Sequence, residues 1–282
     1  MYKAFIFYCS PAGTTRHVAK VMEKELVGYN RQATICELGR DDKKLPGIIQ
    51  EIKETDGPIC LFIGSPVYSS HALPLIMDFI TRLPLKEQAY AVPFVTWGAA
   101  TSGIALAEMG EAFMQQGYNL IGAARIVALH SLMWESENPA GAGHPDHEDD
   151  GLIKNLITEV ENNLQKSNPQ TLQDQVLSYQ SEAVTAEMKQ QNLELARKFL
   201  PPRKVNQDLC NQCGICADEC PVAALTLTPY PTYAKHCILC FNCMRLCPEK
   251  AIEADLSPAH EMVRLRYEKY KEYPLTKIFL PT

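Results

Sequence analysis

Residues 2–17 read YKAFIFYCSPAGTTRH, and the architecture of the first half of the chain follows from them. The run of aromatic and aliphatic residues favours a buried β-strand, and a short turn of small and hydroxyl-bearing residues leads directly into a helical pattern. Such a turn offers backbone N–H groups and hydroxyls to an anion. We therefore expect a phosphate-binding turn, although turns that only cap a helix have a similar composition.

The alternation of strand and helix continues to about residue 166. β-rich runs alternate with segments that carry apolar residues at helical spacing, which is typical of a parallel sheet covered by helices on both faces. We predict an α/β fold with a doubly wound, five-stranded parallel sheet. The predicted strands cover residues 2–8, 33–38, 59–63, 89–96 and 121–129, and the predicted helices cover residues 14–27, 73–83, 104–116 and 152–164.

Two later strands end in loops that belong to the same edge of such a sheet. Residues 64–68 read GSPVY and residues 97–103 read WGAATSG, so each loop combines small residues with one aromatic side chain. Ligands of open α/β sheets bind outside the carboxyl ends of the strands. A phosphate-binding turn and two such loops therefore suit a phosphorylated compound with a flat ring.

In these three loops, residues 1–166 resemble the flavodoxin family. The resemblance implies that the first loop holds the phosphate of FMN and that the two later loops enclose its isoalloxazine ring. Ala12 departs from the family pattern T/S-x-T/S-G-x-T because it lacks a hydroxyl, and Arg16 is close enough in sequence to compensate. The FMN-binding residues that the resemblance implies are Ser10, Ala12, Gly13, Thr14, Thr15, Pro66, Val67, Tyr68, Trp97, Gly98, Ala99 and Gly103.

Some of these features have simpler interpretations. Tyr68 and Trp97 are the expected neighbours of the flavin ring, but either also fits a buried aromatic in a packed loop. Cys9 precedes the phosphate turn, and we interpret it as a core residue rather than a redox-active thiol. His130 follows the last predicted strand and suits an ordinary hydrogen-bonded histidine. The loop 138–150 gathers two histidines and four acids in its last seven positions; we expect helix capping there rather than a metal site.

Residues 171–200 contain neither Gly nor Pro and are bracketed by Pro169 and Pro201, which predicts a helix. Its apolar stripe favours a bridging helix packed on the domains, with a homodimer seam as the alternative. A continuous helix of this length spans about 44 Å, which would separate cofactors at its two ends. We therefore also expect that a homodimer brings each N-terminal half close to the partner's C-terminal module. The stripe consists of Leu177, Val184, Met188, Leu195 and Phe199.

Eight of the eleven cysteines lie within residues 210–247. Residues 210–221 read CNQCGICADECP and residues 237–248 read CILCFNCMRLCP, so every cysteine recurs 27 positions later. Three thiolates at three-residue intervals surround one cubane, and the fourth points toward a second cluster. We expect one [4Fe-4S] cluster on Cys210, Cys213, Cys216 and Cys247, and another on Cys237, Cys240, Cys243 and Cys220.

Residues 204–255 resemble the bacterial-type two-cluster ferredoxins on these motifs. Two structural zinc sites are the alternative, but zinc sites use C-x2-C pairs with a longer spacer. A disulfide-stapled secreted module would not follow 200 residues of cysteine-poor sequence without a leader.

Charge and hydropathy exclude other classes. The net charge of −6 and the scattered basic residues give no field for nucleic acid. No apolar run approaches the roughly 20 residues of a membrane-spanning helix, and the N-terminus does not resemble a signal peptide. We expect a cytoplasmic protein without a membrane span or nucleic-acid partner.

As a whole the chain resembles the flavodoxin–ferredoxin fusion proteins of anaerobic bacteria and archaea. The expected parts are a flavodoxin-like domain (residues 1–166), a helical linker (167–202), a small α+β ferredoxin domain (203–256) and a C-terminal tail (257–282). The resemblance implies electron transfer between FMN, two [4Fe-4S] clusters and a transient partner oxidoreductase. The alternative is an FMN-dependent reductase of a small molecule, with the ferredoxin domain as its electron inlet and with His130, Tyr68 and the 144–150 loop around the substrate. A regulatory redox sensor is a third alternative, for which the sequence shows no switching element.

Overall fold

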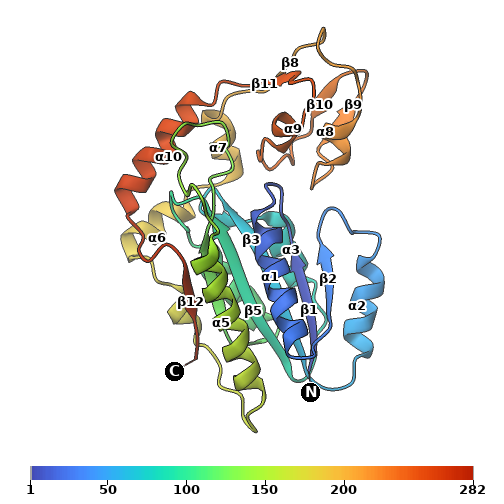
Figure 1. Ribbon diagram of the computed structural model, residues 1–282, viewed down its shortest axis with the longest axis vertical. Coiled ribbons are helices and arrows are strands. Elements are labelled where there is room, and N and C mark those ends of the chain that lie inside the picture. The colour runs from blue at the N-terminus through green and yellow to red at the C-terminus, as the bar shows by residue number, and fades with distance from the viewer. Residues whose placement is uncertain (1, 282) are drawn as a thin grey trace.

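The larger part of the molecule is one sheet with helices on both faces (Figure 1), and the computed structural model describes residues 2–281. The parallel strands follow the order β2-β1-β3-β5-β7. This is the 2-1-3-4-5 order of a flavodoxin-like doubly wound sheet, so the predicted five-stranded parallel sheet is confirmed. Its strands are β1 (Lys3–Tyr8), β2 (Ala33–Glu37), β3 (Ile59–Tyr68), β5 (Ala89–Trp97) and β7 (Ala123–Val127).

Side chains that alternate along β1 build both cores. Phe5 and Phe7 pack with α2, α3 and α4 on one face, whereas Ala4 and Ile6 pack with α1 and α5 on the other. The period of two residues in a strand causes this division. The sequence prediction named no residues for α2. The helices are α1 (Thr14–Gly28), α2 (Leu45–Glu54), α3 (Pro74–Thr81), α4 (Ala105–Gln115) and α5 (His147–Leu164).

The C-terminal residues, expected as a tail, form a helix and a sheet strand. The helix α10 (Ser257–Tyr270) leads to β12 (Lys277–Phe279), which pairs antiparallel with β7 and extends the edge of the sheet. Two further short strands, β4 (His71–Ala72) and β6 (Asn119–Leu120), pair with β3 and β5. The sheet is therefore mainly parallel, and the strand prediction did not contain the antiparallel β4 and β12 or the short parallel β6.

The linker is not one continuous helix, and this part of the sequence prediction was wrong. It consists of a 3-10 turn η1 (Asp174–Leu177) and two short helices, α6 (Glu182–Lys189) and α7 (Leu193–Phe199). The side chains of Ser181 and Asn192 cap α6 and α7, and such residues compete with helix interiors for backbone hydrogen bonds. The 44 Å separation that motivated the homodimer therefore does not arise. In the described part of the chain, every helix is too short or too polar to span a bilayer.

The cysteine-rich part, from β8 to β11, lies beyond the carboxyl ends of the parallel strands (Figure 1). It contains two antiparallel strand pairs, β8 with β11 and β9 with β10. Each cysteine run contains one helix of a single turn. The elements are β8 (Lys204–Val205), α8 (Ile215–Asp218), β9 (Leu225–Leu227), β10 (Pro231–Tyr233), α9 (Asn242–Arg245) and β11 (Ile252–Glu253).

A buried ion pair fastens the C-terminal segment to the sheet. The carboxylate of Glu272 accepts from the guanidinium of Arg125 at 2.5 Å, and their side chains are only 7% and 5% exposed. Glu272 also accepts from the hydroxyl of Thr101 and from the backbone N–H of Ser102. The segment before β12 therefore holds the loop after β5.

The variant Glu272→Ala should lose about 3–5 kcal/mol of unfolding free energy, because it leaves the buried Arg125 charge without its carboxylate. Denaturant unfolding of the purified protein measures this loss. Glu268→Ala is the matched control, since its pair with Lys271 is exposed and its loss should stay within about 0.5 kcal/mol. Equal stability of the two variants would contradict the assignment.

Candidate cofactor sites

A cavity of about 160 Å³ opens at the carboxyl ends of the parallel strands. The loops after β1, β3, β5 and β7 all contribute to its wall, so the structure brings the three expected loops together. Of the residues expected to bind FMN, Ser10, Gly13, Ala99 and Gly103 do not line the cavity although they belong to these loops. Those that do line it are Ala12, Thr14, Thr15, Pro66, Val67, Tyr68, Trp97 and Gly98.

The turn after β1 lies directly at the N-terminus of α1. Gly13 has a φ of +91°, a left-handed conformation that favours glycine, and directly precedes the helix. The first N–H groups of a helix have no intrahelical partner and can face a ligand. The hydroxyl of Ser10 accepts the N–H of Arg16, and the hydroxyls of Thr15 and Thr96 lie 2.7 Å apart.

Arg16 does not compensate for the missing hydroxyl of Ala12, contrary to the sequence interpretation. Its guanidinium pairs with both carboxylate oxygens of Glu37, at 2.8 and 2.9 Å, at the end of β2. A different cation approaches the turn. Arg245 of α9 donates to the carbonyl oxygens of Pro11 and Ala12 at 2.7 and 3.1 Å.

Tyr68 presents a buried polar atom to the cavity. Its hydroxyl has no hydrogen-bond partner among the described residues. Burial raises the pKa of this phenol above its ordinary value, so the group stays a neutral donor and acceptor. A buried hydroxyl without a partner costs about 1–3 kcal/mol, and a polar ligand in the cavity would remove that cost.

Trp97 lines the same cavity, and a hydrogen bond to the C-terminal segment fixes its side chain. Its indole N–H donates to the carbonyl oxygen of Leu275, which precedes β12. The adjacent Gly98 permits a close approach, since a Cβ there would lie 2.5 Å from the ring of His130. The C-terminal segment and His130 therefore set the position of this loop.

His130 lines the cavity as a neutral imidazole. Burial, assisted by the charges of His260 and Arg266, lowers its pKa to about 4. Its Nδ1 accepts the backbone N–H of Leu132 at 3.3 Å, which places the proton on Nε2. At neutral pH the ring can therefore donate a hydrogen bond, but it carries no positive charge.

The remaining wall of the cavity comes from the second half of the chain, which the sequence interpretation missed. Ile238 and Leu239, between two cysteines of the second run, face the flavodoxin-like loops. The helices α7 and α10 close the side with apolar residues and one cation, Arg266. No local pattern marks these residues, because their role depends on contacts across the chain.

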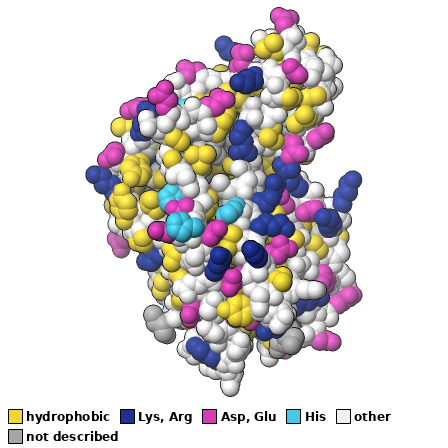
Figure 2. Space-filling view, viewed as in Figure 1, with side chains coloured by type: hydrophobic (Ala, Val, Ile, Leu, Met, Phe, Trp, Pro, Cys, Tyr) yellow, Lys and Arg dark blue, Asp and Glu magenta, His cyan; other side chains and the backbone are white. Residues whose placement is uncertain are grey.

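Polar contacts hold the cysteine-rich part against the sheet. Besides the bonds of Arg245 to the turn after β1, Arg40 pairs with Glu219, and Gly39 packs against the carbonyl of Pro221. On the face drawn in Figure 2, Lys and Arg side chains gather along this junction. The cavity is thus shared between the two parts of one chain.

The structure brings the eight cysteines together in two groups of four. A cavity of about 20 Å³ is lined by one group of four, which we term the outer cysteine set. In the inner cysteine set, burial raises the pKa of Cys240 to about 12, and its three neighbouring thiols add to the shift. The outer set is Cys210, Cys213, Cys216 and Cys247, and the inner set is Cys220, Cys237, Cys240 and Cys243.

The two cysteine runs also repeat in backbone conformation. Left-handed residues occur at two positions of the first run and at one position just after it, and again 27 residues later. The N–H of Ala224 donates to Cys220 Sγ and that of Ala251 to Cys247 Sγ, both at 3.2 Å. The left-handed pairs are Gln212 and Leu239, Gly214 and Phe241, and Ala223 and Lys250.

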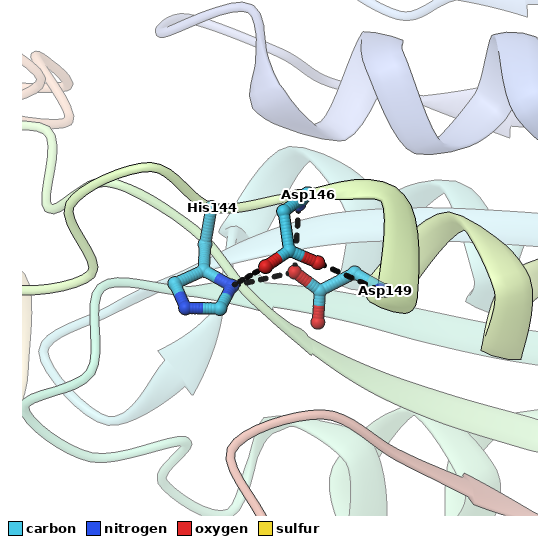
Figure 3. A group of neighbouring side chains, drawn as sticks. All are labelled: His144, Asp146 and Asp149. Carbon is cyan, nitrogen blue, oxygen red and sulfur yellow. Dashed lines mark hydrogen bonds and ion pairs between the residues drawn. The ribbon is translucent and has the colours of Figure 1, made fainter.

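The other candidate residues have structural roles. Cys9 is buried in the sheet core, as expected, and so are Cys36 and Cys60. In the 144–150 loop, His144, Asp146 and Asp149 place ligand-type atoms within 4.8 Å of one another (Figure 3). Asp146 and Asp149 form the capping box of α5, so the capping interpretation is confirmed. This loop does not line the large cavity.

Comparison with known proteins assigns the cysteine motif. Residues 203–226 match the model of the 4Fe-4S binding domain. Over 24 residues, 8% of this chain, the sequence is 67% identical to a probable ferredoxin of Methanosarcina thermophila. That match spans 41% of the ferredoxin's length. The chain therefore carries a 4Fe-4S ferredoxin motif.

Three solved structures are similar to part of this chain. A flavodoxin from the domain Archaea is 18% identical, with a TM-score of 0.44, and covers 58% of this chain and 99% of its own. An apo NADH:FMN oxidoreductase is 16% identical, with a TM-score of 0.46. That match covers 60% of this chain and 92% of the oxidoreductase. Rubredoxin oxygen:oxidoreductase of Desulfovibrio gigas is 17% identical, with a TM-score of 0.44. That match covers 58% of this chain and 37% of the oxidoreductase.

Stability should fall as the pH is lowered from 6.5 toward 4. In this window the unfolded chain protonates His130 while the folded chain, with its lowered pKa, does not. The variant His130→Gln should lose this part of the pH dependence, and denaturant unfolding across the window measures it. The exposed His147→Gln serves as control, and a wild-type slope in the His130 variant would refute the assignment.

Proposed function

We propose that the chain is an electron-transfer protein that holds FMN in the large cavity and a [4Fe-4S] cluster on each cysteine set. The observation that carries this proposal is the shared wall. The Ile238–Leu239 segment of the inner set faces the same cavity as the phosphate turn, Tyr68 and Trp97. A flavin bound there would lie beside the inner cluster within one chain.

The residues around the cavity fit FMN. The turn before α1 would receive the phosphate, and the guanidinium of Arg245 is hydrogen-bonded to this turn. Tyr68 would offer its unpartnered hydroxyl to a polar edge of the ring. Trp97 and Gly98 would support the ring from the loop after β5. The neutral His130 adds a donor without adding charge.

The cysteine sets fit two clusters. Each set combines three thiolates of one run with the last cysteine of the other, and each receives one backbone N–H at a sulfur. Such hydrogen bonds stabilise the negative charge of a cluster. When bound, FMN exchanges one or two electrons, whereas each cluster exchanges one at a time.

The arrangement suggests where a protein partner docks. The cavity is covered by the cysteine-rich part, α7 and α10, whereas Cys213 of the outer set is exposed. We infer that a partner oxidoreductase exchanges electrons at the outer cluster. The net charge of −6 favours a partner with a basic surface and an encounter that weakens with salt.

A small-molecule reductase is the second candidate. The apolar side chains of α7 and α10, including Leu193, Phe199 and Met262, extend the cavity wall beyond the expected flavin loops. They would suit an apolar acceptor beside the flavin. Reduction of such an acceptor by the purified, anaerobic protein alone would favour this candidate over the carrier.

Purification without oxygen should yield a brown protein with about eight iron atoms and about one FMN per chain. Iron, sulfide and flavin quantification measures this content. A variant with Cys240→Ala should lose about half of the iron, because one of the two sets loses a ligand. Zinc in place of iron, or colourless anaerobic protein, would contradict the proposal.

The variant Tyr68→Phe should bind FMN about fivefold more weakly, since one hydrogen bond contributes about 1 kcal/mol. Without flavin it should be at least as stable as the wild type, because the unpartnered hydroxyl is gone. Flavin titration and thermal unfolding measure the two effects. Tyr118→Phe, whose hydroxyl bonds Pro84 outside the cavity, is the control. Unchanged FMN affinity in Tyr68→Phe would remove Tyr68 from the site.

A further inference from the structure

The two cysteine sets differ in the charge that faces their sulfur atoms. The guanidinium of Arg203 donates to Cys237 Sγ at 3.3 Å and to Cys243 Sγ at 3.6 Å, both in the inner set. Its Cζ lies 3.9 Å from the ring centre of Tyr233 and 5.0 Å from that of Phe241. Two aromatic rings and two sulfurs therefore fix one cation on the inner set.

Among residues 2–281, no such cation lines the outer set. The internal repeat places Tyr230 at the position 27 residues after Arg203, and Asn206 and Gly214 at the positions that correspond to Tyr233 and Phe241. Among the described residues that line the outer cavity, Glu249 is acidic and none is Lys or Arg. The duplicated halves therefore share their backbone hydrogen bonds to sulfur but not this side chain.

Further guanidinium groups surround the inner set. Arg197 of α7 donates to the carbonyl oxygens of Lys235 and Cys237, at 2.9 and 2.8 Å. Arg245 lies two residues after Cys243 and bonds the phosphate turn. Arg203 differs from both, because it alone of the three donates directly to sulfur.

We propose that Arg203 makes the two clusters electrochemically inequivalent, giving the inner, flavin-side cluster the higher reduction potential. This inference rests on the proposed function. Reduction adds one negative charge to a cluster, and a cation hydrogen-bonded to two of its thiolates stabilises the reduced state more than the oxidised state.

The direction of electron flow follows from this asymmetry. One electron passes from the outer cluster to the inner cluster. The transfer oxidises the outer cluster and reduces the inner cluster, and no proton moves and no bond changes. An electron delivered by a partner at Cys213 therefore moves inward, toward the cavity. Arg203 determines which of the two clusters holds that electron at equilibrium.

The test is a potentiometric titration of the anaerobic holoprotein, followed by electron paramagnetic resonance, for the wild type, Arg203→Met and Arg203→Lys. The wild type should show two resolved midpoint potentials. In Arg203→Met the higher midpoint potential should fall, and the difference between the two potentials should become smaller. Arg203→Lys should shift the higher potential less. Arg264→Met removes an exposed cation of α10 and should move neither.

Two outcomes of the titration overturn the inference. Arg203→Met overturns it when both potentials stay unchanged or when both fall equally. A wild-type protein without iron–sulfur clusters overturns the proposed function together with the inference. Intact clusters whose reduction potentials do not depend on Arg203 overturn the inference alone.

A measurement on the wild type covers the case in which Arg203→Met does not assemble. During stepwise reduction, selectively labelled cysteine β-protons show which cluster takes the first electron. The signals of Cys237 and Cys243 should respond before those of Cys210 and Cys213. The reverse order would refute the proposal without any variant.

Discussion

The contact between the turn after β1 and α9 is the constraint on which the rest of the arrangement depends. Arg245 donates to two carbonyl oxygens of the turn from a position between Cys243 and Cys247. One side chain therefore connects the end of β1 to both cysteine sets. Because Arg245 is half-buried, losing the two carbonyl acceptors would leave its charge with only the side-chain oxygen of Asn242 as a partner. This contact keeps the inner set against the cavity rather than at the end of a long linker.

The C-terminal segment stabilises the opposite side of the cavity. Residues expected as a tail supply β12, the Glu272 carboxylate and the carbonyl that accepts the Trp97 indole. They hold the loop after β5, while α7 and α10 cover the opening. The cavity is therefore assembled from segments of the whole chain, and the flavodoxin-like sheet provides only its base. This enclosure separates the two proposed roles: the proposed flavin site is covered, whereas the exposed Cys213 is where we propose that a partner protein docks.

Features with a local pattern could be predicted from the sequence, whereas features that depend on distant contacts could not. The parallel strands follow from their apolar runs, and the crossed cysteine sets follow from the C-x2-C-x2-C-x3-C-P spacing. The linker prediction failed because the absence of Gly and Pro permits a helix but does not require one, and capping residues such as Ser181 and Asn192 start new helices within it. Arg203 and Arg245 carry no motif, and their roles appear only when residues far apart in sequence meet.

The central claim is that one chain places its flavin beside the inner cluster. Pulse reduction of the anaerobic holoprotein, with the flavin and cluster absorbances followed over time, tests this most directly. The account predicts that electrons equilibrate between the cofactors in a first-order process whose rate does not change with protein concentration. A rate that rises in proportion to protein concentration would show that the electron passes between molecules, and would contradict the account.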